Sequence, residues 1–503
     1  MVRLLPGMVW AGALMVLASC TTTAEIEPVA LDKGRPNVLE VYQSPELTAY
    51  GISAQTTGDP EWSGGTIASD SFGYFKALIA KPLFRPFSSL KRLFFLTTNT
   101  AIDLVKPVSL LWEADGPVPL VSQRPGMDLR LWEQQLDVLT GTQESRGSIR
   151  LLIDGDQFFP RFVDAVMAAQ SSIHLRSYIF DTDDYATAIA DLLKQRSEQI
   201  EVKVLLDGLG TLVAAGVAPV SMPRTFNPPG SMEQYLERNS NVSVRVQSNP
   251  WLTGDHTKAF IIDRQTAFVG GMNIGREYRF DWHDLMMEVR GPVVEEIERE
   301  FDKAWSRAGF FGDFEYLVQS LRPKEKVEAG VGHPVRVLYT KSGDSQIYRA
   351  QLAAIRAAQR YIYIHSPYFS DDQFLVELVR ARRRGVDVRV ILPTSNDSPI
   401  MGQSNRLAAN ALFRRGVRVY RFPGFSHVKA AIYDGWACLG SANLDKMSLR
   451  VNMELNLATS NRNVVEALER QLFVPDFEKS AEMTEPVEED WSYYLAELLA
   501  DQL

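Results

Sequence analysis

Two short segments of the chain carry the same arrangement of reactive side chains. "HTKAFIID" begins at His256 and "HVKAAIYD" begins at His427, and both read His, any residue, Lys, four residues, Asp. The whole chain of 503 residues holds only six histidines, so this agreement points to a duplicated site. Residues two apart in an extended strand point to one face. We therefore expect each imidazole to share a face with its lysine, Lys258 or Lys429.

The correspondence between the copies extends beyond these segments. A glycine turn in "VGGMN" presents Asn273, and a similar turn in "LGSANLD" presents Asn443. An acid then follows in both copies at a matching place, once a deletion of one residue in the second copy is allowed. Each half thus offers a histidine, a lysine, an asparagine and an acid: His256, Lys258, Asn273 and Asp284 in the first half, and His427, Lys429, Asn443 and Glu454 in the second.

These residue types suit chemistry on a phosphodiester, provided that the two halves pack with their faces together. One imidazole can attack phosphorus while the other protonates the leaving oxygen. The lysines and asparagines can hold the non-bridging oxygens as charge redistributes. Asp284 and Glu454 are expected to accept a hydrogen bond from the far ring nitrogen of the histidine in their own half, which fixes its tautomer. The lysines supply positive charge, so we expect the reaction to need no metal and no other cofactor.

Other polar residues of the repeat receive structural interpretations. Asp263 and Asp434 stand seven residues after their histidines, an odd number that points to the opposite face of a strand. We expect them to brace a turn by hydrogen bonds. The remaining histidines have no matching histidine in the other copy and are interpreted as packing or surface residues, although one of them adjoins Asp284: His174, His283, His333 and His365.

The elements that must position these residues alternate between strand and helix. From about residue 148, apolar runs such as "SIRLLID" alternate with helically spaced segments such as "QFFPRFVDAVMAAQ", which indicates an α/β sheet with helical crossovers. The same order recurs, and "AAQSSIHLRSYIF" aligns with "AAQRYIYIHSPYF" without a gap. We therefore predict two similar α/β halves related by a pseudo-twofold axis, with an N-terminal extension. The predicted division is a signal peptide at 1–20, the extension at 21–145, the halves at 146–322 and 333–480, and a tail at 481–503.

The N-terminal residues are typical of a secretory signal and are not expected to be part of the folded domains. Arg3 precedes an apolar run shorter than the ~18 residues of a spanning helix, as in a secretory signal. "LASC" ending at Cys20 resembles the lipobox of bacterial lipoproteins, which implies cleavage before this cysteine and its lipidation; the alternative is a simple signal or anchor. A lipidated Cys20 would leave Cys438, interpreted as a buried strand residue, without a disulfide partner. Residues 75–112 mix aromatic and basic side chains, and either lie in a membrane interface or form helices packed on the body.

The duplicated segments also carry a family resemblance. "HTKAFIID…GGMN" and "HVKAAIYD…GSANLD" resemble the paired HKD motifs of the phospholipase D superfamily, and "WHDLMMEVRGPVV" and "FDKAW" resemble its bacterial cardiolipin synthases. The resemblance covers about residues 148–475. It implies a metal-free reaction through a phosphohistidine intermediate, with His256 as the nucleophile. One departure is Gly271, where the second copy has Ser441.

Three functions compete at this stage. The first is a phosphatidyl transferase that forms cardiolipin from phosphatidylglycerol. The second is a hydrolase, either a phospholipase D or another phosphodiesterase or nuclease, and the third is a non-enzymatic envelope lipoprotein. The formal net charge of −9 argues against a nucleic-acid partner. The expected partners are phospholipid substrates and a membrane surface, and the expected location is the bacterial cell envelope, lipid-anchored and facing the periplasm.

Overall fold

The computed structural model describes most of the two predicted halves. It covers residues 44–52, 90, 118–211, 219, 221–223, 226–247, 254–309, 312–321 and 332–488. The signal peptide, Cys20, and residues 75–112 apart from Leu90 lie outside this description, as do residues 322–331 at the junction of the two predicted halves. Within the described ranges, no helix combines the length and the apolar character needed to cross a membrane.

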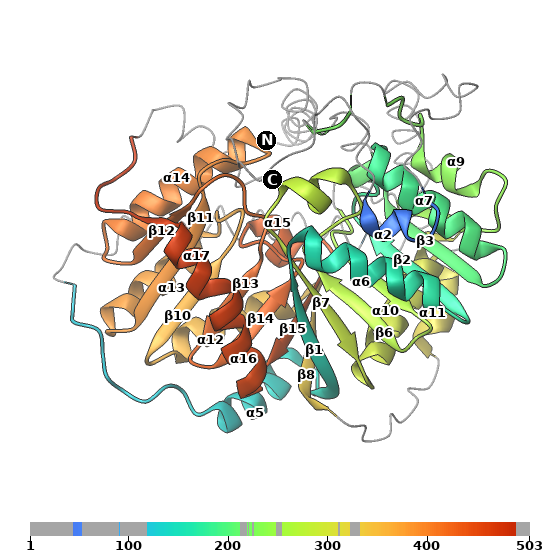
Figure 1. Ribbon diagram of the computed structural model, residues 1–503. Helices are drawn as coiled ribbons and strands as arrows, with labels where there is room; N and C mark the ends of the chain where they lie inside the picture. The colour runs from blue at the N-terminus through green and yellow to red at the C-terminus, as the bar shows by residue number, and fades with distance from the viewer. Residues whose placement is uncertain are drawn as a thin grey trace, which may run out of the picture.

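One sheet of 16 strands runs through both halves, which meet at its centre where β1 pairs with β8 (Figure 1). The first half contributes β1 (Ser145–Ile153), β2 (Ser172–Ser177), β3 (Glu201–Asp207), β4 (Ser243–Gln247), β5 (Ala259–Ile262), β6 (Thr266–Gly270) and β7 (Leu285–Arg290). The second contributes β8 (His333–Lys341), β9 (Asp344–Ser345), β10 (Tyr361–His365), β11 (Asp387–Pro393), β12 (Arg418–Phe422), β13 (Ala430–Tyr433), β14 (Trp436–Gly440), β15 (Glu454–Thr459) and β16 (Ala481–Glu482).

The strand order is the same in both halves when it is read outward from the centre. The first half runs β1-β7-β6-β5-β2-β3-β4, and the second runs β8-β15-β14-β13-β10-β11-β12, followed by β16. In each half the outer strands are parallel and the inner strands are antiparallel. This arrangement confirms the predicted pair of similar α/β halves and places a pseudo-twofold axis between β1 and β8.

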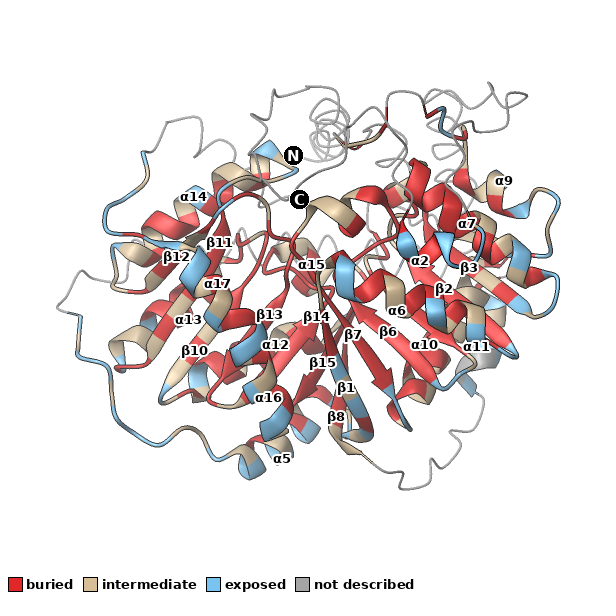
Figure 2. Ribbon diagram, in the orientation of Figure 1, coloured by how far each residue is buried: buried red, intermediate tan, exposed pale blue. Residues whose placement is uncertain are grey.

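Helices cover both faces of the sheet, so that most strand residues are buried (Figure 2). In the first half they are α6 (Asp154–Ala168), α7 (Asp184–Ser197), α9 (Met232–Glu237), the π-helix η3 (Glu277–Asp281), α10 (Val293–Ala308) and α11 (Gly312–Leu321). In the second half they are α12 (Gln346–Ala357), α13 (Asp372–Arg383), α14 (Pro399–Phe413), α15 (Lys446–Arg450), α16 (Arg462–Leu468), the π-helix η4 (Glu469–Phe473) and α17 (Val474–Lys479). Among the described residues before the repeat lie α2 (Pro45–Thr48) and α5 (Leu129–Thr140).

Three apolar cores hold these layers together. One core belongs to the first half and one to the second. The third contains residues of both halves, among them Val289 from β7 and Leu457 from β15, and α10 closes it with Phe301. Burial of apolar surface on this shared face favours association of the halves, so the two copies form one body.

Parts of the extension pack directly on the repeat. On the second half, α5 places Trp132 edge to face against Trp436, with ring centroids 5.3 Å apart. Buried Arg336 of β8 donates a hydrogen bond to Asp137 of α5 at 2.7 Å. At the C-terminal end, β16 pairs with β12, so the first residues of the predicted tail also lie in the sheet.

The two motif aspartates lie at tight turns that follow β5 and β13. Asp263 and Asp434 both adopt left-handed backbone conformations, with φ of 52° and 50°. The carboxylate of Asp263 accepts hydrogen bonds from the backbone N–H groups of Gln170, Ser171 and Ser172, at 2.8, 2.7 and 3.0 Å. Asp434 receives the corresponding N–H groups of residues 359–361. Both acids therefore fasten the loop that leads into the adjacent strand, and neither contacts a motif histidine.

Replacement of Asp263 by alanine should destabilise the fold without touching the reactive groups. Alanine loses the charge-assisted bonds and tolerates the left-handed backbone poorly, so we expect the free energy of unfolding to fall by about 2–4 kcal/mol. Asp263→Asn should lose less, because asparagine accepts this backbone conformation and keeps one acceptor. Urea denaturation measures both losses.

The same experiment has a defined pH dependence. Burial disfavours the charge of Asp263, but the backbone N–H groups outweigh it and lower the pKa. The stabilisation should be complete above the unfolded-state pKa of about 3.9 and should vanish as the pH falls through the lower folded value. A difference between wild type and Asp263→Ala that is independent of pH would contradict the assigned role.

Candidate active site

The two motif segments meet at the centre of the molecule, in extended chain just before β5 and β13. The expectation that the histidines and lysines lie within regular strands is wrong, because β5 begins at Ala259 and β13 at Ala430. Each segment instead forms an isolated bridge with the opposite half, Asp255 with Met453 and Ser426 with His283. The duplicated segments are therefore joined across the pseudo-twofold axis.

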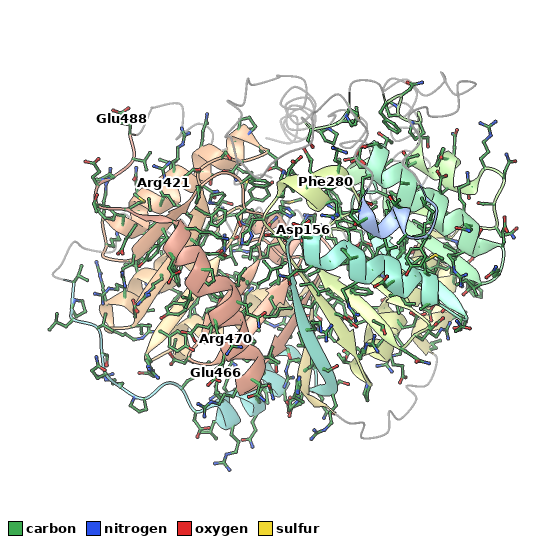
Figure 3. All side chains as sticks on the ribbon, in the orientation of Figure 1. Asp156, Phe280, Arg421, Glu466, Arg470 and Glu488 are labelled. Carbon is green, nitrogen blue, oxygen red and sulfur yellow. The ribbon has the colours of Figure 1, made fainter. Side chains whose placement is uncertain are left out.

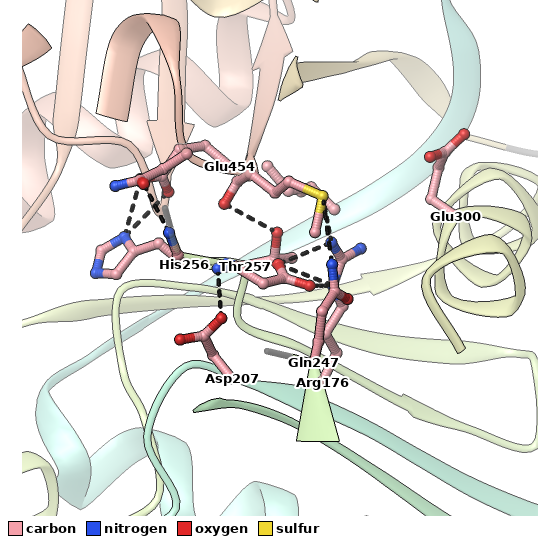
Figure 4. A network of polar contacts seen from close by, with 12 residues as sticks. Arg176, Asp207, Gln247, His256, Thr257, Glu300 and Glu454 are labelled. Carbon is pink, nitrogen blue, oxygen red and sulfur yellow. Dashed lines mark hydrogen bonds and ion pairs between the residues drawn. The ribbon is translucent and has the colours of Figure 1, made fainter. Parts of the chain in front are cut away.

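The acids exchange partners between the halves. Nδ1 of His256 lies 3.0 and 3.1 Å from the two carboxylate oxygens of Glu454 (Figure 4). Nδ1 of His427 lies 2.7 Å from Oδ2 of Asp284. The predicted pairing of each acid with the histidine of its own half is thus wrong, although all four residues lie in the site.

Backbone geometry explains this exchange. His256 N–H donates to the carbonyl of Met453 at 2.9 Å, and His427 N–H donates to the carbonyl of His283 at 2.7 Å. Met453 and His283 are the residues immediately before Glu454 and Asp284. Each motif histidine is therefore registered beside the acid of the opposite half.

A buried ion pair fixes the segment that carries His256. Arg176 Nε and Nη2 donate to Asp255 at 2.9 and 2.8 Å, and Asp255 N–H donates to Asp207 at 2.8 Å (Figure 4). Arg176 comes from β2 and Asp207 from the end of β3, so the sheet itself anchors the residue before His256. This bidentate contact restricts rotation of the segment and keeps the imidazole aligned with Glu454.

The lysines are buried beside their histidines. Lys258 Nζ donates to the carbonyl of His256 at 2.9 Å, and Lys429 Nζ donates to the carbonyl of His427 at 2.6 Å. Lys258 is fully buried and Lys429 is 3% exposed. Burial lowers the pKa of Lys429 to about 8 and holds the pKa of Lys258 well below its usual value. An anionic ligand would favour the protonated form of both groups.

Burial also moves the pKa values of the two histidine–acid pairs. It lowers the pKa of His256 and His427 well below the usual range, and the nearby lysines lower them further, so both rings are neutral at pH 7. Burial raises the pKa of Asp284 to about 6 and that of Glu454 to about 8. Two lysines and two acids in their charged forms cancel, and a bound phosphodiester then adds one negative charge. One proton shared within a histidine–acid pair balances that charge, so one pair can act as a general acid while the other imidazole stays neutral and can act as a nucleophile.

The Gly271 and Ser441 difference matches the different lengths of the acids. A Cβ atom at Gly271 would lie 2.2 Å from Oδ1 of Asp284, so only glycine leaves room for this shorter carboxylate. At the matching position, the Ser441 hydroxyl donates to Oε2 of Glu454 at 2.6 Å. Each half thus has its own way of holding the acid that serves the opposite histidine.

The two asparagines occupy different surroundings. Asn273 Oδ1 accepts from Ile179 N–H at 3.0 Å, and its Nδ2 donates to the Tyr278 hydroxyl at 2.7 Å. These bonds tie Asn273 to the wall of the site. Oδ1 of Asn443 is buried and has no hydrogen-bond partner among the described residues. Contact with phosphate oxygens therefore remains an expectation for both side chains.

Aromatic side chains, which the sequence did not single out, enclose the histidines. The Tyr178 ring lies 4.9 Å from the His256 ring, while Trp282 and Tyr278 lie 5.3 and 5.8 Å from the His427 ring. These walls reduce the access of water to His427, whose side chain is only 5% exposed.

The loop that carries Trp282 and Asp284 is held on α6 through η3. Arg279 donates to Glu46 at 2.7 Å and also pairs with Asp156 of α6. Phe280 packs on Tyr185 with ring centroids 5.5 Å apart. Figure 3 shows Asp156 and Phe280 close together where these elements meet.

Three acids lie near the site: Asp181 is buried, Glu277 is half-buried, and Asp397 is exposed and accepts a hydrogen bond from the Tyr368 hydroxyl. Burial raises the pKa of Asp181 to about 7 and that of Glu277 to about 8. Carboxyl groups that become protonated near pH 7 repel an anionic substrate less than ionised ones. The acids therefore permit a phosphate group to approach.

The remaining histidines fall into distinct places. His174 is buried between Glu298 and Glu201, at 2.7 and 2.8 Å. His283 and His365, which come from different halves, lie behind the pair of His427 and Asp284 with ring centroids 5.9 Å apart. The adjacency of His283 to Asp284 was the one sequence signal of this second cluster.

Comparison with known proteins agrees with the duplicated architecture. The family described as "Cardiolipin synthase, PLD-like domain" matches residues 162–305 and 352–473. Each stretch contains the histidine, lysine, asparagine and acid of its half. Cardiolipin synthase A of Pseudomonas entomophila (strain L48) is 31% identical over 352 residues, which cover 68% of this chain and 70% of that protein. Cardiolipin synthase of Listeria innocua serovar 6a is 29% identical over 349 residues, which cover 67% and 70%.

A solved structure shares the fold. The crystal structure of phosphatidylserine synthase from Haemophilus influenzae Rd KW20 superposes with a TM-score of 0.56 at 14% sequence identity. The match covers 74% of this chain and 95% of that chain. At this identity the likeness concerns the fold alone.

Gly271→Ala should inactivate the protein far more severely than Ser441→Gly. The new methyl group must displace Asp284 from His427, whereas Ser441→Gly removes one hydrogen bond to Glu454, worth about 1 kcal/mol or up to tenfold in rate. Turnover and the circular dichroism spectrum should be measured for both variants. Equal losses in two folded variants would contradict the steric role of Gly271.

The exchanged pairs can be tested in solution. Asp284→Asn should alter the ring ¹⁵N signals of His427 and leave those of His256 unchanged, and Glu454→Gln should do the reverse. Activity should fall by about 10³–10⁴-fold in each case, because the amide can favour the wrong tautomer and cannot stabilise an imidazolium. Spectra of His256→Ala and His427→Ala show which ring ¹⁵N signals belong to which histidine and so serve as the control. Signal changes confined to the histidine of the same half would refute the exchange.

Proposed function

Because this chain belongs to the phospholipase D superfamily, in its cardiolipin synthase-like group, we propose that it transfers a phosphatidyl group from phosphatidylglycerol to the hydroxyl of a second phosphatidylglycerol. The products are cardiolipin and glycerol. The observation that carries the proposal is the pair of motif imidazoles, each oriented by the acid of the other half. The complete set of reactive groups and membership of an enzyme family argue against the non-enzymatic interpretation.

In the first step His256 acts as the nucleophile. Its Nε2 attacks phosphorus, the new P–N bond forms, and the bond to the glycerol oxygen breaks. His427, protonated when the anionic substrate binds, gives its proton to the departing oxygen. The assignment of roles rests on the resemblance to the family, and it agrees with exposure, since the side chain of His256 is 13% exposed and that of His427 is 5% exposed.

In the second step His427 acts as a base. It removes the proton from the incoming headgroup hydroxyl, whose oxygen attacks phosphorus and breaks the P–N bond. His256 leaves as a neutral imidazole and His427 is again protonated, so charge and protons balance over the cycle. Lys258 and Lys429 stabilise the negative charge on the non-bridging oxygens in both steps.

The choice between a lipid hydroxyl and water as acceptor depends on how dry the site is. The aromatic residues around His427 favour exclusion of water and hence transfer. Hydrolysis is the alternative activity of the same groups. Both substrates are lipids, so we infer that the reaction takes place at a membrane surface, with lipidation at Cys20 as the proposed anchor.

The test is an assay of the full chain on vesicles that contain phosphatidylglycerol, with lipids resolved by mass spectrometry. We expect cardiolipin and free glycerol in equal amounts. His256→Ala, His427→Ala and the double variant should all fall to a similar residual rate, because residues of one catalytic unit are not additive. Labelled substrate should trap a phosphohistidine at position 256 in His427→Ala.

The outcomes separate the alternatives. Phosphatidic acid as the main product would identify a hydrolase and overturn the transfer proposal. A trapped phosphohistidine at position 427 would reverse the roles of the two histidines. Nearly additive losses in the double variant would argue against a shared site.

A further inference from the structure

A second cluster of ionisable side chains lies outside the proposed reaction. Nε2 of His283 is 3.0 Å from Oδ2 of Asp476, and Nδ1 of His365 is 3.2 Å from the same oxygen. All three donor atoms lie within 4.8 Å of one another. His283 is 9% exposed, and the other two are 1% exposed. The loop before β7, the end of β10, and α17 each supply one of these residues, so the cluster joins both halves.

The far nitrogen of each ring has its own partner. Nδ1 of His283 lies 2.7 Å from Asp154, and Nε2 of His365 lies 2.8 Å from the Ser426 hydroxyl. Metal-bound histidines commonly direct the far N–H to a carboxylate or another acceptor, which fixes the ring and its tautomer. Two rings so oriented present their other nitrogens toward Asp476. Phe422 stacks on His283 with ring centroids 4.9 Å apart and keeps this face apolar.

The internal repeat supplies a comparison within the same chain. His365 aligns with Arg176, Ser426 with Asp255, and His283 with Met453. We call the set of Arg176, Asp255 and Met453 the first corner, and the matching set of His365, Ser426 and His283 the second corner. At the first corner a bidentate ion pair between Arg176 and Asp255 satisfies the buried charges. At the second corner the shorter His365 and Ser426 cannot reproduce that pair, and Asp476 enters from α17. The two corners share a backbone plan, but only the second gathers metal-type donors.

Charge and spacing then indicate what holds the second corner together. Asp154 and Asp476 bring two negative charges in their ionised forms, which a divalent cation balances while both rings stay neutral. Donors of a tetrahedral zinc site lie about 3.3 Å apart, close to the two distances found here. We propose that His283, His365 and Asp476 bind one divalent transition-metal ion, with Zn²⁺ the best match to two imidazoles and a carboxylate.

This ion would have a structural role. The His283 carbonyl accepts a hydrogen bond from His427 N–H, and Ser426 directly precedes His427. A metal would therefore tie together the two backbone segments that hold the second catalytic histidine. None of its ligands belongs to the eight predicted reactive residues, so the expectation of a metal-free reaction is unaffected.

The experiment is metal analysis of the purified full chain by inductively coupled plasma mass spectrometry. We expect about one zinc per chain. His365→Gln and Asp476→Asn should lose it, whereas Asp154→Asn should keep the ligands and weaken affinity about 10–100-fold. Co²⁺ exchanged into the protein should give the visible absorption of a four-coordinate site. These readouts do not depend on the proposed activity.

Two variants control for nonspecific effects. His174→Gln removes another buried histidine that lies between two carboxylates, and it should leave the metal content unchanged. His365→Arg with Ser426→Asp copies the ion pair of the first corner, and it should fold without metal. The proposal is overturned if the wild type contains no metal and added Zn²⁺ or Co²⁺ neither binds nor raises the unfolding temperature. In that case hydrogen bonds from a protonated imidazole, and not a metal ion, hold the cluster together. The ¹⁵N spectra should then show His283 as an imidazolium.

Discussion

The exchange of acids across the pseudo-twofold axis is the interaction on which the rest of the site depends. His256 relies on Glu454 and His427 relies on Asp284, so neither half contains an oriented imidazole by itself. The backbone bonds from each histidine to the residue before the opposite acid enforce the exchange. The shared apolar core and the pairing of β1 with β8 therefore contribute to the geometry of the site as well as to stability.

Electrostatics follows from that geometry. Six ionisable groups lie in a region with little water, where an unbalanced charge is costly. The opposed lysines and acids keep the site near neutrality, and the shifted pKa values of Lys429 and Glu454, both about 8, show how closely these groups depend on one another. A phosphodiester disturbs this balance by one charge, which a single proton on one histidine–acid pair restores. In the proposed mechanism, substrate binding thus favours the protonation state that the first step requires.

The sequence predicted much of this arrangement, and the reasons for its failures are physical. Hydrophobic periodicity and an ungapped repeat identified the α/β halves, because each half forms its own layers from local segments. The same repeat located His256, His427 and both acids, since duplication keeps residue types in order. Spacing along the chain could not show that Asp284 serves His427, because that pairing depends on how the halves meet. The aromatic walls and the partners of His283 were missed for the same reason: their contacts join distant segments.

Departures from the repeat carry information of a different kind. A symmetric frame would by itself make the two histidines equivalent, yet the shell around them differs. Gly271 leaves space for a short acid, while Ser441 donates to a longer one. Behind His256 stands an arginine–aspartate ion pair, and behind His427 stands a cluster of two histidines and an acid. In the proposed transfer, one imidazole bonds to phosphorus while the other carries a proton. The asymmetry of the supporting residues agrees with this proposed division of roles between the two copies of the motif.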